Sequence, residues 1–317
     1  MAAVPSCKTQ VPSAAGQPEA AAWQEARERL ARRFGAQLEE WWPRVPALVA
    51  GLCERWQLDL GAPVGTGNTS LVLRCRRANG RPAILKVTPD AAIAATEAFA
   101  LRGWAPSGRV PAVWDADPDA GALLLEAIAI HAPLPDQAAG VTIEQIAGLI
   151  RDLHGSGAPV TGPGVGPLAD RVDVIFGLWA GRRARSEAMS RAVPAGRLER
   201  GHELARSLAA TPAAPPVLLH GDLHPGNVLD GGPARGLVAI DPRPSVGEPA
   251  ADVVDWVFWR ADGVSAWETR NQELATALGL DPARLWTWCT AFAAMFAASC
   301  AARGDLAPVQ DLLAIAP

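Results

Sequence analysis

Residues 220–227 read HGDLHPGN, and the pair Ile240-Asp241 follows them along the chain. Two short apolar runs, 217–219 and 237–240, bracket this polar segment, so we expect it to be a loop between strands. Its Pro-Gly pair suits a tight turn in which the backbone can approach an anionic ligand closely. Carboxylate, amide and imidazole groups thus stand together on one short loop, which indicates a chemical site.

The spacing within this loop suits phosphoryl transfer. Transfer from ATP to a hydroxyl requires a proton acceptor near the attacking oxygen and oxygen ligands that hold Mg²⁺ on the phosphates. Four residues separate Asp222 from Asn227, as in the catalytic loop of protein kinases. We therefore expect Asp222 to be the catalytic carboxylate, and Asn227 and Asp241 to be the Mg²⁺ ligands. His220 is expected to donate a hydrogen bond that supports the loop.

Two other interpretations of the loop are open. His220, Asp222 and His224 stand at alternating positions and could hold zinc or iron, because imidazole and carboxylate groups suit these ions. That interpretation leaves Asn227 and Asp241 without a role. The second alternative is that the polar side chains only satisfy backbone groups of a turn.

Lysine is rare in this chain, which makes one position informative. Of the 29 Lys and Arg residues, only Lys8 and Lys86 are lysines, and Lys8 lies in a segment that we expect to be a tail. A site that needs a compact ammonium group would keep lysine against a composition that otherwise favours arginine. Lys86 is therefore expected to pair with the phosphates of ATP, held in place by Glu97 of the following helix.

The first half of the chain predicts a small sheet behind a leading helix. Apolar residues recur at helical spacing over 21–56, with an interruption at Pro43. Apolar segments with turn residues between them then predict, in order, strands at 58–64, 71–76 and 81–87, a helix at 89–102, and strands at 110–114 and 122–128. We expect five antiparallel strands with one helix inserted after the third.

Two loops of this sheet are candidates for nucleotide binding. Gly65 and Gly67 lie in a hairpin suited to covering phosphates, although the third glycine of the GxGxxG pattern is missing. At the end of the last strand, the backbone groups of Glu126 and Ile128 could receive the adenine. These residues are predicted to bind ATP together with the lysine–glutamate pair.

The second half of the chain predicts a mainly helical lobe. A proline-rich stretch follows Ile130, and a helix then opens at Thr142, which forms a capping box with Gln145. Helical patterns dominate 168–210 and 266–303. We divide the chain into a flexible tail (1–20), an N-terminal nucleotide-binding lobe with its leading helix (21–129), and a C-terminal catalytic and substrate-binding lobe (130–317).

Composition excludes several classes of protein. The net charge is −4 and basic residues are interspersed with acidic ones, so we expect no nucleic-acid partner. No run of about 18 apolar residues is present, so no membrane partner is expected. Five cysteines without a CxxC pair argue against a disulfide framework and indicate the cytoplasm. We expect a monomer or a weak dimer that acts on a small-molecule substrate.

One long segment resembles the aminoglycoside phosphotransferase superfamily and, within it, the aminoglycoside/hydroxyurea phosphotransferases. This segment is residues 217–258, VLLHGDLHPGNVLDGGPARGLVAIDPRPSVGEPAADVVDWVF. The resemblance spans roughly residues 40–305 and implies an α+β, protein-kinase-like bilobal fold. It implies Asp222 as catalytic aspartate, Asn227 and Asp241 as Mg²⁺ ligands, and Lys86 with Glu97 as the phosphate-positioning pair. By the same resemblance, Asp252 would brace the catalytic loop.

The resemblance implies an antibiotic-resistance kinase that transfers the γ-phosphoryl group of ATP to a hydroxyl of a streptomycin-like aminoglycoside. On the acceptor side, Asp255, Asp262 and Glu268 are the carboxylates that could meet a cationic substrate. Other acceptors consistent with the residues are hydroxyurea, a peptide antibiotic and a metabolic alcohol. A non-catalytic nucleotide-binding pseudokinase is the alternative of another class, against which the intact set of site residues argues.

Overall fold

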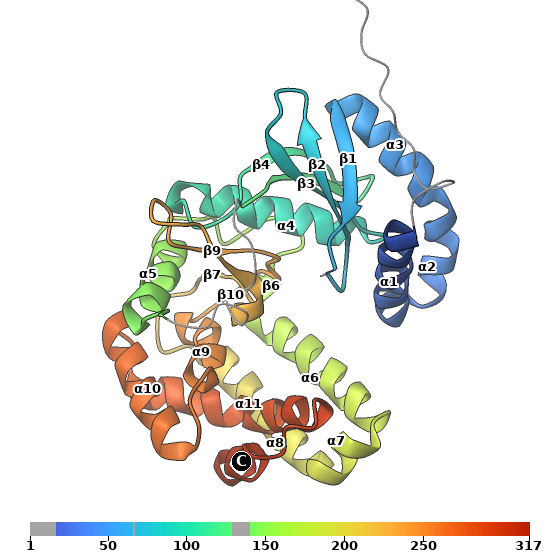
Figure 1. The fold of residues 1–317 in the computed structure, drawn as a ribbon. Coiled ribbons are helices and arrows are strands. Elements are labelled where there is room, and N and C mark those ends of the chain that lie inside the picture. Colours follow the sequence, from blue (N-terminus) through green and yellow to red (C-terminus); the bar gives the residue numbers. More distant parts are fainter. Residues whose placement is uncertain (1–16, 66, 129–139) are drawn as a thin grey trace, which may run out of the picture. The chain divides into compact units, whose positions relative to one another are not determined.

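The computed structural model describes residues 17–65, 67–128 and 140–317, and the chain divides into two compact units (Figure 1). Unit 1 comprises residues 1–102 and 111–129, and unit 2 comprises residues 103–110 and 130–317. Of the tail expected over 1–20, residues 1–16 lie outside the described residues, and a helix already begins at Gln17. Residues 103–110, which were expected in the first lobe, belong to unit 2.

Unit 1 begins with helical segments and continues as a sheet. The helical segments are α1 (Gln17–Phe34), α2 (Ala36–Trp41), the 3-10 turn Trp42–Arg44 and α3 (Val45–Trp56). The sheet consists of β1 (Leu58–Pro63), β2 (Leu71–Arg77), β3 (Pro82–Val87), β4 (Val113–Asp117) and β5 (Ala122–Glu126), with α4 (Ala91–Trp104) after β3. The strand order is β1-β2-β3-β5-β4 and all neighbours are antiparallel. The predicted five-stranded antiparallel sheet with one inserted helix is confirmed.

The leading helix of unit 1 is broken twice. The interruption expected at Pro43 falls in the 3-10 turn before α3. A second break lies at Gly35, whose φ of 52° is in the left-handed region that glycine adopts readily. The breaks let α1 and α3 both contact the sheet beside β1, as Figure 1 shows.

Side chains alternate between the two faces of the sheet along each strand, so the two faces differ in what they carry. Leu73, Leu85 and Leu124 are cross-strand neighbours on one face, where they are buried in a core shared with α1–α3. Lys86 is shifted by one residue and points to the other face, where Val72 and Leu123 are its cross-strand neighbours. The strand period therefore places the lysine on the face that carries α4.

Unit 2 is mainly helical, as predicted. Its helices are α5 (Ile143–His154), α6 (Leu168–Ala184), α7 (Glu187–Ala192), α8 (Ala195–Ala210), α9 (Val254–Phe258), α10 (Val264–Leu278), α11 (Pro282–Ala302) and α12 (Val309–Ile315), with 3-10 turns at Ala105–Ser107, Pro225–Asn227 and Pro249–Asp252. The strands are β6 (Gly166–Pro167), β7 (Val217–Leu219), β8 (Val228–Asp230), β9 (Leu237–Ala239) and β10 (Ser245–Gly247). They form one sheet of order β6-β10-β7 and a β8-β9 pair. The capping box of Thr142 and Gln145 is present at the start of α5.

Helix α11 forms the core of unit 2. Helix α8 comes close to it at Gly201, where a Cβ would lie 2.4 Å from the carbonyl oxygen of Ala291. By length and apolar composition α11 could cross a membrane, but 61% of its apolar window is buried inside the protein. Helices of the same unit pack around it (Figure 1). Its apolar character is therefore accounted for by the core.

A buried carboxylate joins the turn before α9 to α8 and α11. Glu248 is 1% exposed, accepts hydrogen bonds from the Ala213 N–H at 2.7 Å and the Arg284 Nε at 2.9 Å, and is contacted by the Trp288 indole N–H. Arg284 also donates to the carbonyl of Thr211 at 2.7 Å, at the end of α8. One charge pair thus fixes three elements of the core.

We predict that Glu248→Ala lowers the stability of unit 2 by about 3–5 kcal/mol, because it leaves the Arg284 charge in the core without its carboxylate. Native-state hydrogen exchange of α11 peptides measures this loss. Glu273→Ala, on the exposed side of α10, is the matched control and should change little. Equal protection of α11 in both variants would contradict the prediction.

Candidate active site

In unit 1, the predicted phosphate-binding lysine lies in a buried ion pair. The Lys86 Nζ donates to both carboxylate oxygens of Glu97, at 2.6 and 2.7 Å. The side chains are 9% and 2% exposed, so water does not screen the pair. Lys86 comes from β3 and Glu97 from α4. The pair holds an ammonium group in one place, which is what binding a phosphate requires.

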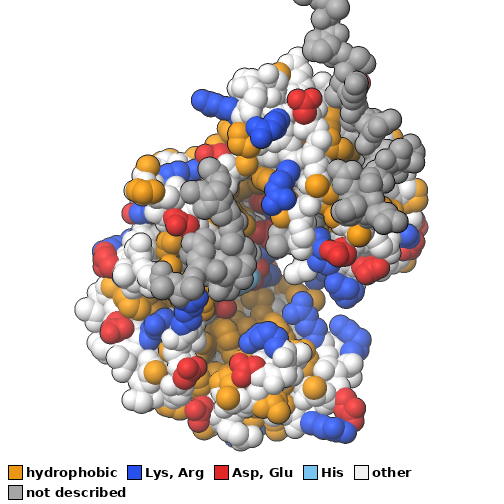
Figure 2. All heavy atoms as spheres, viewed as in Figure 1, with side chains coloured by type: hydrophobic (Ala, Val, Ile, Leu, Met, Phe, Trp, Pro, Cys, Tyr) orange, Lys and Arg blue, Asp and Glu red, His pale blue; other side chains and the backbone are white. Residues whose placement is uncertain are grey.

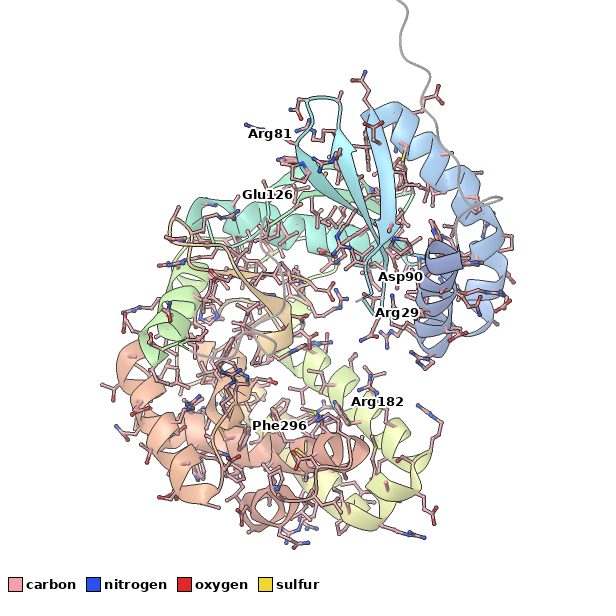
Figure 3. All side chains as sticks on the ribbon, viewed as in Figure 1. Arg29, Arg81, Asp90, Glu126, Arg182 and Phe296 are labelled. Atoms are coloured by element: carbon pink, nitrogen blue, oxygen red, sulfur yellow. The ribbon has the colours of Figure 1, made fainter. Side chains whose placement is uncertain are left out.

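The glycine hairpin between β1 and β2 contains one position that only glycine fits. Gly67 has a φ of 107°, and a Cβ there would lie 3.0 Å from a backbone oxygen. Gly65 has open space around it. Arg29 of α1 donates to the Gly67 carbonyl at 3.4 Å, and Figure 3 shows it beside this end of the sheet. The hairpin is therefore linked to the leading helix.

The two residues expected to bind adenine differ in their hydrogen bonding. The N–H of Glu126 donates to the Ala112 carbonyl at 2.9 Å, and its side chain accepts from the Ala112 N–H at 3.1 Å. Figure 3 places Glu126 at the end of β5. Ile128 follows two residues later, and its N–H has no partner among the described residues. Ile128 is therefore the better candidate for a backbone donor to a base.

In unit 2, the structure brings Asp222 and Asn227 together. The Asn227 Nδ2 donates to the Asp222 carbonyl at 2.9 Å and to its Oδ2 at 3.2 Å. The turn between them is closed by the Gly226 N–H, which donates to His224 Nδ1 at 3.0 Å. The loop thus folds back on itself so that both predicted functional side chains meet at its end.

Asp252 fixes the start of this loop. Its carboxylate accepts from the backbone N–H groups of His220 at 2.7 Å and Gly221 at 2.9 Å, and from His154 Nε2 at 3.0 Å. Burial alone would raise the pKa of Asp252, but the hydrogen bond and charge of His154 and the hydrogen bond from the Gly221 N–H hold it below its ordinary value. Asp252 therefore stays ionised while it orients the loop.

Gly221 permits a close backbone crossing within the site. Its φ is 71°, and a Cβ there would lie 2.0 Å from the carbonyl oxygen of Arg243. The Arg243 N–H in turn donates to the His220 carbonyl at 2.8 Å. The segment that carries Asp241 is thereby held against the loop 220–227.

The groups around Asn227 and Asp241 fit Mg²⁺. The Asn227 amide nitrogen is directed at Asp222, so its oxygen points elsewhere, and no described residue donates to that oxygen. The Ile240 N–H donates to the Asn227 carbonyl at 2.8 Å, which brings the neighbouring Asp241 to the loop. Amide and carboxylate oxygens are the ligands that Mg²⁺ prefers.

Asp241 is also the residue of the site with an unusual backbone. Its φ of 57° is rare for a residue other than glycine, and such conformations cluster at functional sites. Arg243 donates to its two carboxylate oxygens at 3.3 and 3.4 Å. A metal ion bound there would compete with this guanidinium for the carboxylate.

His220 is held neutral inside the protein. Its ring stacks on Trp104 with centroids 6.0 Å apart, and its Nε2 lies 3.1 Å from the Ile240 carbonyl, to which it donates. The buried Nδ1 has no hydrogen-bond partner in the described structure. Burial is the main reason that the pKa of His220 falls to about 4, against the opposing charge of Asp252.

Three residues that contact the site were not predicted from the sequence. His154 contacts Asp252, Arg243 contacts Asp241, and Arg171 contacts Asp222. Arg243 lies two residues from its partner and could have been suspected from that spacing alone. The other two come from α5 and α6, and their contacts with Asp252 and with the loop exist only in the folded chain.

Among the acceptor-side carboxylates, Asp255 is the one that interacts electrostatically with the loop. Burial raises the pKa of Asp255 to about 6; His224 opposes this, and the charges of Asp222 and Asp252 add to it. Asp262 and Glu268 are exposed on the surface of unit 2. Asp255 is therefore the acceptor-side candidate that the structure links to the loop.

The alternative of a transition-metal site finds no support in the geometry. Within the described ranges, no three His, Cys, Asp or Glu side chains are placed to share a metal ion. His220 uses its Nε2 on the Ile240 carbonyl, and His224 uses its Nδ1 on the Gly226 N–H. The two imidazoles therefore serve the shape of the loop.

Comparison with known proteins agrees with the resemblance noted from the sequence. The family model described as aminoglycoside/hydroxyurea antibiotic resistance kinase matches residues 55–304. A hydroxyurea phosphotransferase of Kitasatospora aureofaciens is 36% identical over 81% of this chain and 73% of its own length. A streptomycin 6-kinase of Streptomyces glaucescens is 32% identical over 81% of this chain and 83% of its own length.

Solved structures confirm the protein-kinase-like fold class. The choline kinase LicA of Streptococcus pneumoniae superimposes with a TM-score of 0.56, covering 84% of this chain and 99% of that protein. Its sequence identity is 14%, so this similarity concerns the fold alone.

We predict that His220 makes unfolding sensitive to mild acid. In the unfolded chain the imidazole takes up a proton near pH 6.5, whereas the folded protein resists protonation until about pH 4. The free energy of unfolding should therefore fall by about 3 kcal/mol as the pH drops from 6.5 to about 4. Below about pH 4, protonation of His220 should lower it no further. Urea unfolding of wild type and His220→Gln across this range measures the difference.

The matched control is His202→Gln, on α8, whose ring is 33% exposed. The His220→Gln variant should lose part of the pH dependence and the control should keep it. Identical slopes for the wild type and His220→Gln would show that the buried imidazole does not resist protonation.

Proposed function

Because the chain belongs to the aminoglycoside/hydroxyurea antibiotic resistance kinase family, we propose that it transfers the γ-phosphoryl group of ATP to a hydroxyl of streptomycin or a related aminoglycoside. The observation that carries this proposal is the loop in which Asn227 and Asp222 are hydrogen-bonded to each other beside Asp241. A pseudokinase would be expected to have lost one of these groups or the buried Lys86–Glu97 pair.

In the proposed reaction, Asp222 accepts or orients the proton of the acceptor hydroxyl. The hydroxyl oxygen forms a bond to the γ-phosphorus as the bond from that phosphorus to the β-phosphate oxygen breaks, and ADP leaves. Lys86, held by Glu97, would bind the α- and β-phosphates. Gly65 and Gly67 would lie over the phosphates, and the backbone at Glu126 and Ile128 would receive the adenine.

Mg²⁺ is the metal that the donor set suits. Asn227 and Asp241 would hold it through their side-chain oxygens. When bound, the ion would neutralise charge on the phosphates during transfer. Asp252 and His220 would act through the loop, by keeping its backbone in place.

Hydroxyurea is the second candidate acceptor. A hydroxyurea phosphotransferase is 36% identical to this chain, a little more than the streptomycin kinase. A cationic aminoglycoside would be expected to meet several carboxylates, whereas of the three candidates Asp255, Asp262 and Glu268 it is Asp255 that interacts with the loop. Two classes of hydroxyl-bearing acceptor, which differ in charge, are therefore candidates.

The proposed enzyme works in the cytoplasm as a monomer or weak dimer. On the face of each unit that Figure 2 shows, basic and acidic side chains are interspersed, which favours a small-molecule substrate over a nucleic acid. The acidic net charge of −4 supports the same conclusion.

A panel of acceptors tests the proposal directly. Purified protein is incubated with ATP, Mg²⁺ and either streptomycin, hydroxyurea, viomycin or a 3'-hydroxyl aminoglycoside, and the products are weighed by mass spectrometry. We expect streptomycin to gain one phosphoryl group. Phosphorylation of hydroxyurea alone would select the second candidate, and transfer to none of the four would contradict the proposal.

We predict that Lys86→Arg lowers kcat/KM for ATP by about a hundredfold, because the planar guanidinium cannot take the place of a compact ammonium in the buried pair. Steady-state kinetics with saturating acceptor measures this. The matched control is Arg81→Lys, at the β2–β3 hairpin tip labelled in Figure 3, which should be neutral. Kinetics of Lys86→Arg equal to those of the wild type would show that the lysine has no such role.

A further inference from the structure

Arg171 lies in the first turn of α6 and contacts the catalytic loop twice. Its Nε donates to the Gly221 carbonyl at 2.9 Å, and its terminal nitrogen donates to Asp222 Oδ1 at 3.3 Å. The Arg171 side chain is 17% exposed and that of Asp222 is 39% exposed. The guanidinium therefore spans from the backbone of the loop to the carboxylate that is proposed to act on the acceptor.

The contact complements that of Asn227. Asn227 donates to Asp222 Oδ2 at 3.2 Å, so each oxygen of this carboxylate has its own donor. The terminal torsion of aspartate is soft and roughly two-fold, so a partly exposed carboxylate without partners would sample many orientations. The two donors restrict it from both sides.

The fold places Arg171 with little freedom. Gly166 of β6, Ser245 of β10 and Leu219 of β7 lie side by side across the three-stranded sheet. The catalytic loop leaves this sheet after Leu219, and α6 begins directly after β6. The first turn of α6 and the loop therefore start from two strands of the same sheet that lie on either side of β10.

Close packing fixes that first turn of α6. A Cβ on Gly247 of β10 would lie 2.6 Å from the Leu168 side chain, so the helix start sits directly on the strand. Leu168 and Val172, on either side of Arg171, are buried. The backbone that carries the guanidinium is thus anchored by the core.

We propose that Arg171 is a positioning residue for phosphoryl transfer, which holds the Asp222 carboxylate in the orientation that receives the acceptor proton. This inference rests on the proposed function of Asp222. The role needs arginine, because a single guanidinium reaches two acceptors in a fixed fork, whereas the lysine ammonium is one point charge on a flexible stem.

The test compares Arg171→Lys and Arg171→Met with the wild type. Transfer from Mg²⁺–ATP to streptomycin and to hydroxyurea is measured, and ATP hydrolysis, which is transfer to water, is measured alongside as a reaction that needs no acceptor. We expect both variants to lose kcat by about a hundredfold, since a small misplacement of a reacting group is enough for this. KM for ATP and the melting temperature should stay at the wild-type values.

The matched control is Arg182→Met. Arg182 is eleven residues further along α6 and is exposed, stacked on Trp179 at 4.8 Å (Figure 3). It keeps the same helix and residue type but lies about 16 Å from Arg171. Its kinetics should match the wild type.

A double-mutant cycle separates positioning from a general structural effect. If Arg171 acts through Asp222, then Arg171→Met should change nothing further in an Asp222→Asn background. The inference would be overturned by additive losses in the cycle or by a loss confined to KM or to the melting temperature. An unchanged or raised kcat in both Arg171 variants would also overturn it.

Chemical rescue gives a second readout. Millimolar guanidinium chloride should restore part of the activity of Arg171→Ala, and sodium chloride at the same concentration should not. Absence of any rescue, together with additivity in the cycle, would assign Arg171 to folding alone. Full activity of Asp222→Asn would instead refute the proposed function itself, so the two failures are distinguishable.

Discussion

The Asp252 carboxylate is the group on which the geometry of the loop 220–227 depends. A loop that leaves a strand inside a protein must find partners for its backbone N–H groups, because an unpaired buried donor is costly. Asp252 accepts two of them, from His220 and Gly221, and His154 completes its shell. With these donors in place the carboxylate stays charged although it is buried. The direction of the chain toward Asp222 is set at this point.

Unit 1 also contains a buried charge that is stabilised by a partner. Lys86 and Glu97 are each buried, and each is stable there because the other is within 2.7 Å. The strand period places Lys86 on the face opposite the leading helices, so the pair forms where α4 covers the sheet. In both units, a buried charge that the core alone would exclude is kept by a partner from another element.

Much of the fold could be predicted from local patterns. Alternating apolar residues and turn signals located the five strands of unit 1, and Thr142 with Gln145 marked the start of α5, because these signals are local. The strands β6 and β10 were missed, since two or three residues are too few to carry a period.

Some residues of the site could likewise be predicted from local sequence, and others could not. Asp222 and Asn227 meet within one loop, so their spacing in the sequence already indicated that they act together. Lys86 was singled out by the rarity of lysine. Arg171 reaches the loop and His154 reaches Asp252 only through tertiary packing, and a single sequence carries no local trace of such contacts.

The central claim is that this loop carries out phosphoryl transfer, and the most direct test follows the labelled γ-phosphoryl group of ATP in a rapid-quench experiment with wild type and Asp222→Asn. We predict that the label moves to the acceptor with the wild type, and that transfer is slower by about 10²- to 10⁴-fold with the variant. ATP affinity, measured by calorimetry, should be the same for both. Transfer by Asp222→Asn at the wild-type rate would contradict the account.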